Sequence, residues 1–378
     1  MTARHSGTPA PRKQPTGSGG GDCARGTSRP APHSTAPRGF LQVGGVVAVP
    51  LRRVSLITAV VLLVLTAAVA IVTLSLGRLG IPLAELGEAV SGGAKGKNAF
   101  VFERLRGPRL VVALGTGCAL GLSGALFQSA TRNPLGSPDV IGLGAGAGAG
   151  AAFAALMLPG TVPVAVGALV GGVLAMTLVY VSTGTGFRNP ARLVVAGIGV
   201  AAICTAVTQY VVYAMERDKA SALMSYVNGS LSARSWDDAT TIWLVMLCAA
   251  PLTALIARRL SISEMGDDIA QGLGSNPKNT KTFAVVLAIV LSAGAVSVAG
   301  PIAFIALTAP QIAKRITRVP GPHLLLSALT GALLLVLADL CAQQLPLFEN
   351  LPVGIYTMAI GGAYLGYLLV RERRKGTL

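Results

Sequence analysis

The residues of this sequence that could do chemistry are mainly arginines and aspartates. Arg104, Arg106 and Arg109 lie just before an apolar run, and Glu103 precedes them. A guanidinium group binds a carboxylate through two parallel hydrogen bonds, so this cluster could dock an acidic partner. The alternative is that the arginine stems lie along a helix end and place their charges at a membrane interface.

Residues suited to metal binding, nucleotide binding or covalent catalysis do not cluster. The three histidines are His5, His33 and His323, and the cysteines stand singly, without the spacing of a metal or redox motif. Gly96 and Lys97 lack the flanking residues of a phosphate-binding loop. We therefore expect no catalytic residue, no metal, no cofactor and no nucleotide site, in a protein that is not an enzyme.

One acidic residue, Asp339, lies well inside an apolar run, near its outer end. Ionisable groups within membrane spans often mark proton or ion pathways, so a secondary transporter driven by an ion gradient is one reading of the chain. Such transporters usually carry several of these groups, and Asp339 could instead pair locally or cap a turn.

The composition assigns these residues to a membrane protein. Of 378 residues, 52% are hydrophobic and 12% are charged, whereas a soluble domain carries roughly 25% charged residues. Apolar runs long enough for helices recur to the end of the chain. There are ten, at residues 54–76, 110–127, 141–158, 162–182, 193–214, 240–257, 283–300, 302–316, 324–343 and 353–370. We predict an all-α polytopic membrane protein of about ten transmembrane helices, within a domain spanning residues 51–374.

Residues 1–50 differ from the rest, because they are rich in Gly, Ser, Pro and Arg and poor in large apolar side chains. We predict a disordered basic tail there. Much of the net charge of +16 lies in the two terminal segments, which flank apolar runs. This pattern is typical of cytoplasmic ends beside anionic lipid and argues against nucleic acid as a partner. Ten spans place both termini in the cytoplasm and leave the inner loops basic.

Two further features concern contacts between helices or proteins. The inner loop 258–281 has an acidic turn followed by glycines, which suits a short helical hairpin that presents a rigid surface to another protein; the alternative is an ordinary solvated loop. Gly142, Gly146 and Gly150 are spaced four apart. On one helical face they would let neighbouring helices approach closely.

Residues 54–374 resemble the FecCD-type permease subunits of iron-siderophore and vitamin B12 ABC importers. The resemblance is carried by stretches in the order of the family: RGPRLVVALGTGCALGLSGALFQSATRNPLGSPDVIGLGAGAG from Arg106, YVNGSLSARSWDD from Tyr226, GDDIAQGLG from Gly266, SVAGPIAFIALTAPQIAKRI from Ser297, then LLLVLADLCAQ and LPVGIYTMAIGGAYLGYLLVR.

The resemblance implies a type II ABC importer permease in the bacterial plasma membrane. It implies as partners a second permease subunit, two cytoplasmic ATP-binding subunits and an extracytoplasmic substrate-binding protein. The cargo it implies is a ferric siderophore, with cobalamin or haem as alternatives. Arg106 and Arg109 match the arginines that dock the binding protein. The residues that match the family's ATPase-coupling loop are Gly266, Asp267, Asp268, Leu273 and Gly274.

The chain departs from the family pattern at three positions. Gly107 stands where the family usually has leucine, and Gln311 where it commonly has histidine. Gln343 occupies a position that often carries another outer arginine. The docking charge is therefore smaller than is usual in the family, and the acidic surface of the partner is expected to differ.

Overall fold

The computed structural model describes residues 40–43, 47–50, 53–77, 79–184, 190–319, 321–345 and 351–374. The described residues all belong to one compact unit. Most of the predicted basic tail therefore lies outside the described residues.

Every apolar run predicted from the sequence coincides with a helix. The helices are α1 (Arg53–Ser75), α4 (Gly107–Thr131), α5 (Leu143–Met157), α6 (Val164–Ser182), α7 (Pro190–Ala214), α9 (Trp236–Glu264), α11 (Pro277–Ala299), α12 (Ile305–Thr317), α13 (Leu324–Gln344) and α14 (Val353–Arg374). Seven helices of the described part are long and apolar enough to cross a membrane, whereas α5 and α12, with 15 and 13 residues, are shorter. The predicted all-α polytopic membrane fold is confirmed, with ten as an approximate number of spans.

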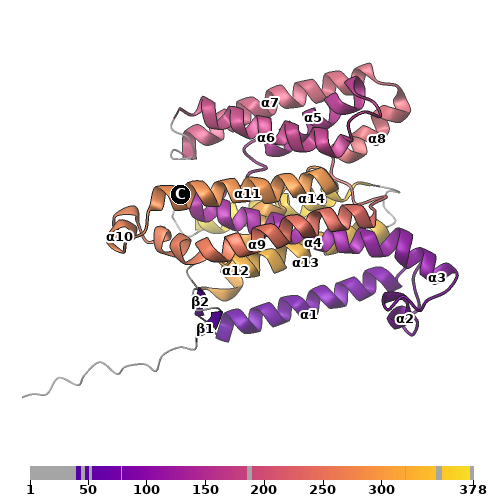
Figure 1. Cartoon of the computed structure of the whole chain (residues 1–378), viewed down its shortest axis with the longest axis horizontal. Coiled ribbons are helices and arrows are strands. Elements are labelled where there is room, and N and C mark those ends of the chain that lie inside the picture. Colours follow the sequence, from indigo (N-terminus) through magenta and orange to yellow (C-terminus); the bar gives the residue numbers. More distant parts are fainter. Residues whose placement is uncertain are drawn as a thin grey trace, which may run out of the picture. The chain divides into compact units, whose positions relative to one another are not determined.

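Short elements connect these helices. They are α2 (Leu86–Val90), α3 (Lys97–Phe100), the π-helix η1 (Val101–Arg106), α8 (Arg217–Val227) and α10 (Asp267–Gly272). Figure 1 shows α10 at the opposite end of the helices from α2 and α3. We call these ends the α10 end and the Arg109 end.

A short antiparallel pair of strands precedes α1. β1 (Phe40–Val43) pairs with β2 (Val47–Pro50), with Phe40 opposite Pro50 and Val43 opposite Val47. The predicted disorder of residues 1–50 therefore does not hold for these two strands. Their sequences, FLQV and VAVP, are more apolar than the preceding tail, and β-branched residues favour extended backbone.

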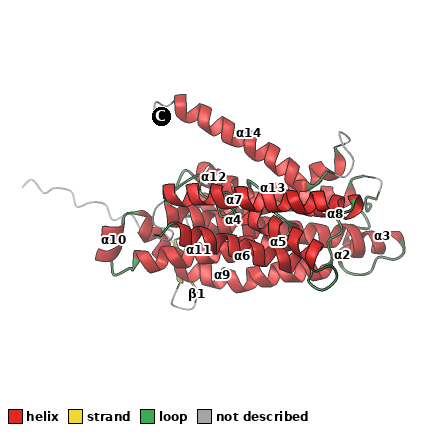
Figure 2. Ribbon diagram, turned by 90° about the horizontal axis from the view of Figure 1, so that it is seen from above, coloured by secondary structure: helices red, strands yellow, loops and turns green. Residues whose placement is uncertain are grey.

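The core is built around α4. Its closest neighbours are α13, α11, α9 and α12, and most of its apolar stretch is buried, whereas α1 is mostly exposed, as expected of a helix that faces lipid. The helices α5, α6 and α7 pack on one another and contact α11 through α5 and α6 (Figure 1). The last helix, α14, contacts α12 and α13 and runs at an angle to them (Figure 2).

Glycines set the distance between α5 and α6. A Cβ atom at Gly146 would lie 2.2 Å from the Cβ of Ala175, and one at Gly150 would lie 2.1 Å from the Gly167 carbonyl oxygen. Gly142 differs from the prediction, because it caps α5 with a left-handed φ of 101° instead of lying within the helix. The three glycines therefore do not share one helical face.

Candidate functional site

The α10 end carries a short helix held between two glycines. Gly266, before α10, has a φ of 134°, and Gly274, after it, has a φ of 74°. Residues other than glycine rarely adopt such backbone angles. The two glycines therefore allow the chain to leave α9, form α10 and enter α11 within a few residues.

This segment exposes three large apolar side chains. Ile269 and Leu273 are spaced four apart along α10 and are 52% and 63% exposed, and Met265, which is 68% exposed, ends α9 just before Gly266. Residues four apart on a helix lie on the same face, and exposed apolar side chains that group on a surface favour a protein contact. The sequence prediction included Leu273 and missed Met265 and Ile269.

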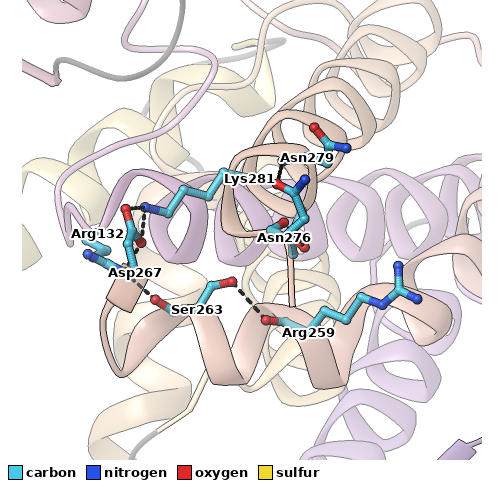
Figure 3. Close-up of polar contacts among 8 residues, drawn as sticks. Arg132, Arg259, Ser263, Asp267, Asn276, Asn279 and Lys281 are labelled. Carbon is cyan, nitrogen blue, oxygen red and sulfur yellow. Dashed lines mark hydrogen bonds and ion pairs between the residues drawn. The ribbon is translucent and has the colours of Figure 1, made fainter. Parts of the chain in front are cut away.

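The carboxylate of Asp267 faces its own chain. Lys281 Nζ lies 2.7 and 2.9 Å from its two oxygens, and Arg132 Nη2 lies 2.5 Å from Oδ1 (Figure 3). The Lys281 hydrogen bond lowers the pKa of Asp267 below its ordinary value, the charges of Lys281 and Arg132 add to this, and partial burial opposes it. Asp267 thus positions α10, while Asp268 is exposed.

Arg132 and the side-chain cap of α11 anchor this segment to the neighbouring helices. Arg132 ends α4 with a left-handed φ of 51° and also donates to the carbonyl oxygen of Ser263 in α9. The Asn276 side chain accepts from the Asn279 N–H, at 3.2 Å, and so caps α11 (Figure 3). The sequence did not predict that Arg132 and Lys281 pair with Asp267. Arg132 precedes Asp267 by 135 residues, and Lys281 follows it by 14 in the same predicted loop.

At the Arg109 end, Arg106 contacts the end of α1. Its Nη1 donates to the carbonyl oxygens of Thr73 and Leu74, at 2.6 and 3.0 Å. The last carbonyls of a helix have no partner within it and carry partial negative charge. Arg106 therefore caps α1 and joins it to α4.

Arg109 forms an ion pair across the bundle. Its Nε lies 2.9 and 3.1 Å from the two oxygens of Asp339 in α13, and its Nη2 lies 2.7 Å from Oδ1. Gln343 donates to Oδ2 of the same carboxylate, at 2.7 Å. Asp339 thus pairs locally, and Gln343, which stands where the family often has arginine, supplies a neutral donor. Both arginines predicted to dock a partner, Arg106 and Arg109, thus have hydrogen-bond partners within the protein, whereas neighbouring Arg104 is exposed.

The π-helix η1 joins this end to α9. The indole N–H of Trp236 donates to the carbonyl oxygen of Glu103, at 2.8 Å, and its ring lies 6.4 Å from that of Phe102. Pro108, two residues after the end of η1, has no N–H to donate and so interrupts the regular helical hydrogen bonds there. The π-helix contains Arg104 and Arg106, and π-helical turns are frequent at functional sites.

The sequence pattern of the FecCD transport family matches residues 55–371. The chain belongs to the FecCD transport family. It is a multi-pass membrane transport protein, since its fold places most of these residues in apolar helices.

Three FecCD relatives illustrate the similarity. The chain is 40% identical over 291 residues to the ferric enterobactin transport system permease protein FepG of Escherichia coli (strain K12), which covers 76% of this chain and 87% of that one. It is 34% identical over 282 residues to the Fe(3+)-citrate import system permease protein YfmE of Bacillus subtilis (strain 168), with 73% and 84% covered. It is 30% identical over 285 residues to the hemin transport system permease protein HmuU of Yersinia pestis, with 73% and 84% covered.

A solved structure shares the fold. An inward-facing metal-chelate type ABC transporter matches with a TM-score of 0.71 and 22% identity, covering 84% of this chain and 99% of that one.

Proposed function

We propose that this FecCD protein is the permease subunit of an ABC importer that takes up a ferric siderophore. The single observation that carries the proposal is α10, a short helix that is held by ion pairs and exposes the large apolar side chains of Ile269 and Leu273. Such a surface suits a second protein that moves, here an ATP-binding subunit. Relatives named as permeases for ferric enterobactin and ferric citrate support the cargo class; haem and cobalamin are alternatives.

The complete importer in this proposal has two permease subunits, two ATP-binding subunits and an external binding protein. The ATP-binding subunits contact the end of α9 and α10 through Met265, Ile269 and Leu273, with Gly266, Asp267, Asp268 and Gly274 shaping that segment. ATP hydrolysis belongs to those partners. The binding protein contacts the opposite end, where Arg104 is exposed and Arg106 and Arg109 contribute.

The proposed orientation in the bacterial plasma membrane follows from charge. The α10 end carries Arg132, Lys278 and Lys281, together with Arg258 and Arg259 at the end of α9. Excess lysine and arginine favour the cytoplasmic side. We place both termini there. At the opposite end, Arg106 and Arg109 break this rule, and each has an internal partner that accounts for its position.

Uptake of iron in cells that lack the protein tests the proposal. Cells complemented with the wild type should accumulate ⁵⁵Fe supplied as ferric enterobactin, ferric citrate or haemin, and the best substrate identifies the cargo. We expect Leu273→Asp to lower uptake by about tenfold, the effect of ~1.4 kcal/mol at a contact. Gln271→Asp is the matched control, because it adds the same charge to the exposed part of α10 away from the apolar side.

Two outcomes would contradict the proposal. Equal uptake with Leu273→Asp and Gln271→Asp, at equal protein levels, would remove the coupling role of α10. Uptake that stops when the proton gradient is collapsed, while ATP persists, would favour an ion-driven secondary transporter. The pairing of Asp339 with Arg109 gives that alternative no support, since the carboxylate is already engaged.

A further inference from the structure

The ion pair of Arg109 and Asp339 lies where a charge is costly. Asp339 is 1% exposed and belongs to a helix long and apolar enough to span the membrane. Just inside the pair, α4 and α13 touch through their backbones, because a Cβ atom at Gly117 would lie 2.5 Å from the Gly331 carbonyl oxygen. The pair therefore closes the end of a tight contact between two helices.

The guanidinium group of Arg109 is only partly used by this pair. Asp339 engages Nε and Nη2, whereas Nη1 has no hydrogen-bond partner among the described residues. The side chain is 21% exposed, so solvent or a partner can reach part of it. A guanidinium presents donors on more than one edge and can bind two carboxylates at once.

We propose that Asp339 is a positioning residue for docking. It holds Nε and Nη2 of Arg109, so that Nη1 is fixed in place for an acidic side chain of the binding protein. One arginine then serves two carboxylates, and α13 is linked to the docked partner through α4. This inference rests on the proposed function, which supplies the binding protein at this end.

Simple electrostatics predicts the opposite effect of removing Asp339. An acidic partner should be attracted more strongly once a negative charge is removed from beside Arg109. In our proposal the partner binds less tightly, because Arg109 keeps its charge and loses its orientation. The sign of the change therefore separates positioning from charge alone.

An anionic lipid headgroup is the other group that could bind Nη1. The structure favours a protein partner, because α4 is the most buried of the apolar helices and Arg109 pairs inward with α13. Lipid headgroups gather around the perimeter of a helical bundle, where α1 is exposed.

The test is the affinity of the assembled importer, in lipid nanodiscs, for the binding protein that supports uptake by the wild type. We expect Asp339→Asn to weaken that affinity about tenfold, a loss of one hydrogen-bonded contact to a charged group. Asp339→Glu should retain most of it. Arg109→Lys should also weaken binding, because an ammonium group lacks the planar set of donors. Thr330→Val is the matched control in α13, since among the described residues that buried hydroxyl donates to the Leu326 carbonyl oxygen of its own helix and to no other group.

Unchanged or tighter binding by Asp339→Asn would overturn the inference, provided that the complex is intact by size-exclusion chromatography. If that variant does not assemble, wild-type affinity in Arg109→Lys overturns it instead. Affinity that depends on anionic lipid in the nanodisc and not on Asp339 would assign Nη1 to a headgroup. Failure of the wild type to bind any protein at this end would overturn the docking part of the proposed function as well.

Discussion

The two ends of α4 carry the same kind of ion pair in different surroundings. Arg109 and Asp339 are 21% and 1% exposed, whereas Arg132 and Asp267 are 38% and 47% exposed. Water competes for the exposed pair and hardly reaches the Asp339 carboxylate of the buried one. The buried pair therefore fixes α4 against α13, while the exposed pair can loosen at little cost.

The expected energies differ accordingly. Removing one partner of a buried ion pair costs about 3–5 kcal/mol, because the other charge stays behind without compensation. An exposed pair contributes about 0.2–1 kcal/mol. If burial and not residue type sets this difference, variants at the Arg109 end should lose several times more stability than variants at the α10 end.

The largest effect is expected from Arg109→Met. Asp339 would keep only the Gln343 donor, so the free energy of unfolding should fall by about 3–5 kcal/mol. The double variant Arg109→Met with Asp339→Leu should recover most of this loss, since no buried charge remains. Unfolding of the purified protein in mixed detergent micelles measures both. A loss below about 1 kcal/mol in the single variant would make this end equivalent to the exposed one.

Gly121→Ala should have the next largest effect. Its Cβ atom would lie 2.1 Å from the carbonyl oxygen of Ser327 in α13, and backbone atoms cannot rotate away as a side chain can. The two helices must separate, at a cost of about 1–3 kcal/mol, and the Arg109–Asp339 distances should lengthen.

Gly199→Ala provides the control for this helix contact. Gly199 lies in α7, and a Cβ atom there would meet nothing within 4 Å. The substitution should be neutral or stabilising by up to about 1 kcal/mol. Thermal unfolding of the two variants side by side compares them, and equal losses of stability would show that the contact between α4 and α13 is not tight.

At the α10 end, Arg132→Gln and Lys281→Met should each cost about 0.2–1 kcal/mol, because the other cation still holds Asp267. The difference from the wild type should shrink at about 1 M salt, where the screening length falls to about 3 Å. Proteolysis of the loop that contains α10 reports on this anchoring. A cost that does not change with salt would mean that these contacts are as shielded as those at the Arg109 end.

The smallest effect concerns pH. Because the folded-state pKa of Asp267 is lowered, its contribution is fully present above the unfolded value of about 3.9 and is lost as pH falls through the lower folded value. The difference in proteolytic protection between wild type and Asp267→Asn should therefore be constant near neutral pH and decrease below about pH 4. If this difference instead grew as the pH fell, the pKa of Asp267 in the folded protein would be raised and not lowered.

The sequence singled out two regions of interest but did not predict which of their charged atoms pair. The arginines before the second span stood out because they opposed the charge rule, and residues 258–281 stood out because an acidic turn and glycines followed each other. Gly142 was placed on a helical face, although the helix begins one residue later. Nothing local in the sequence paired Arg109 with Asp339, which lies 230 residues away.

The sequence alone determined the class of fold, because the length and apolarity of each run are local properties that a membrane converts directly into helices. It also determined where the chain must turn, through its glycines and prolines. Only the tertiary structure decided which charges are shared inside the molecule and which are presented outside. Burial and pairing depend on the helices that pack beside a residue, so Arg109 became part of a buried pair, whereas Ile269 and Leu273 of α10 stayed exposed.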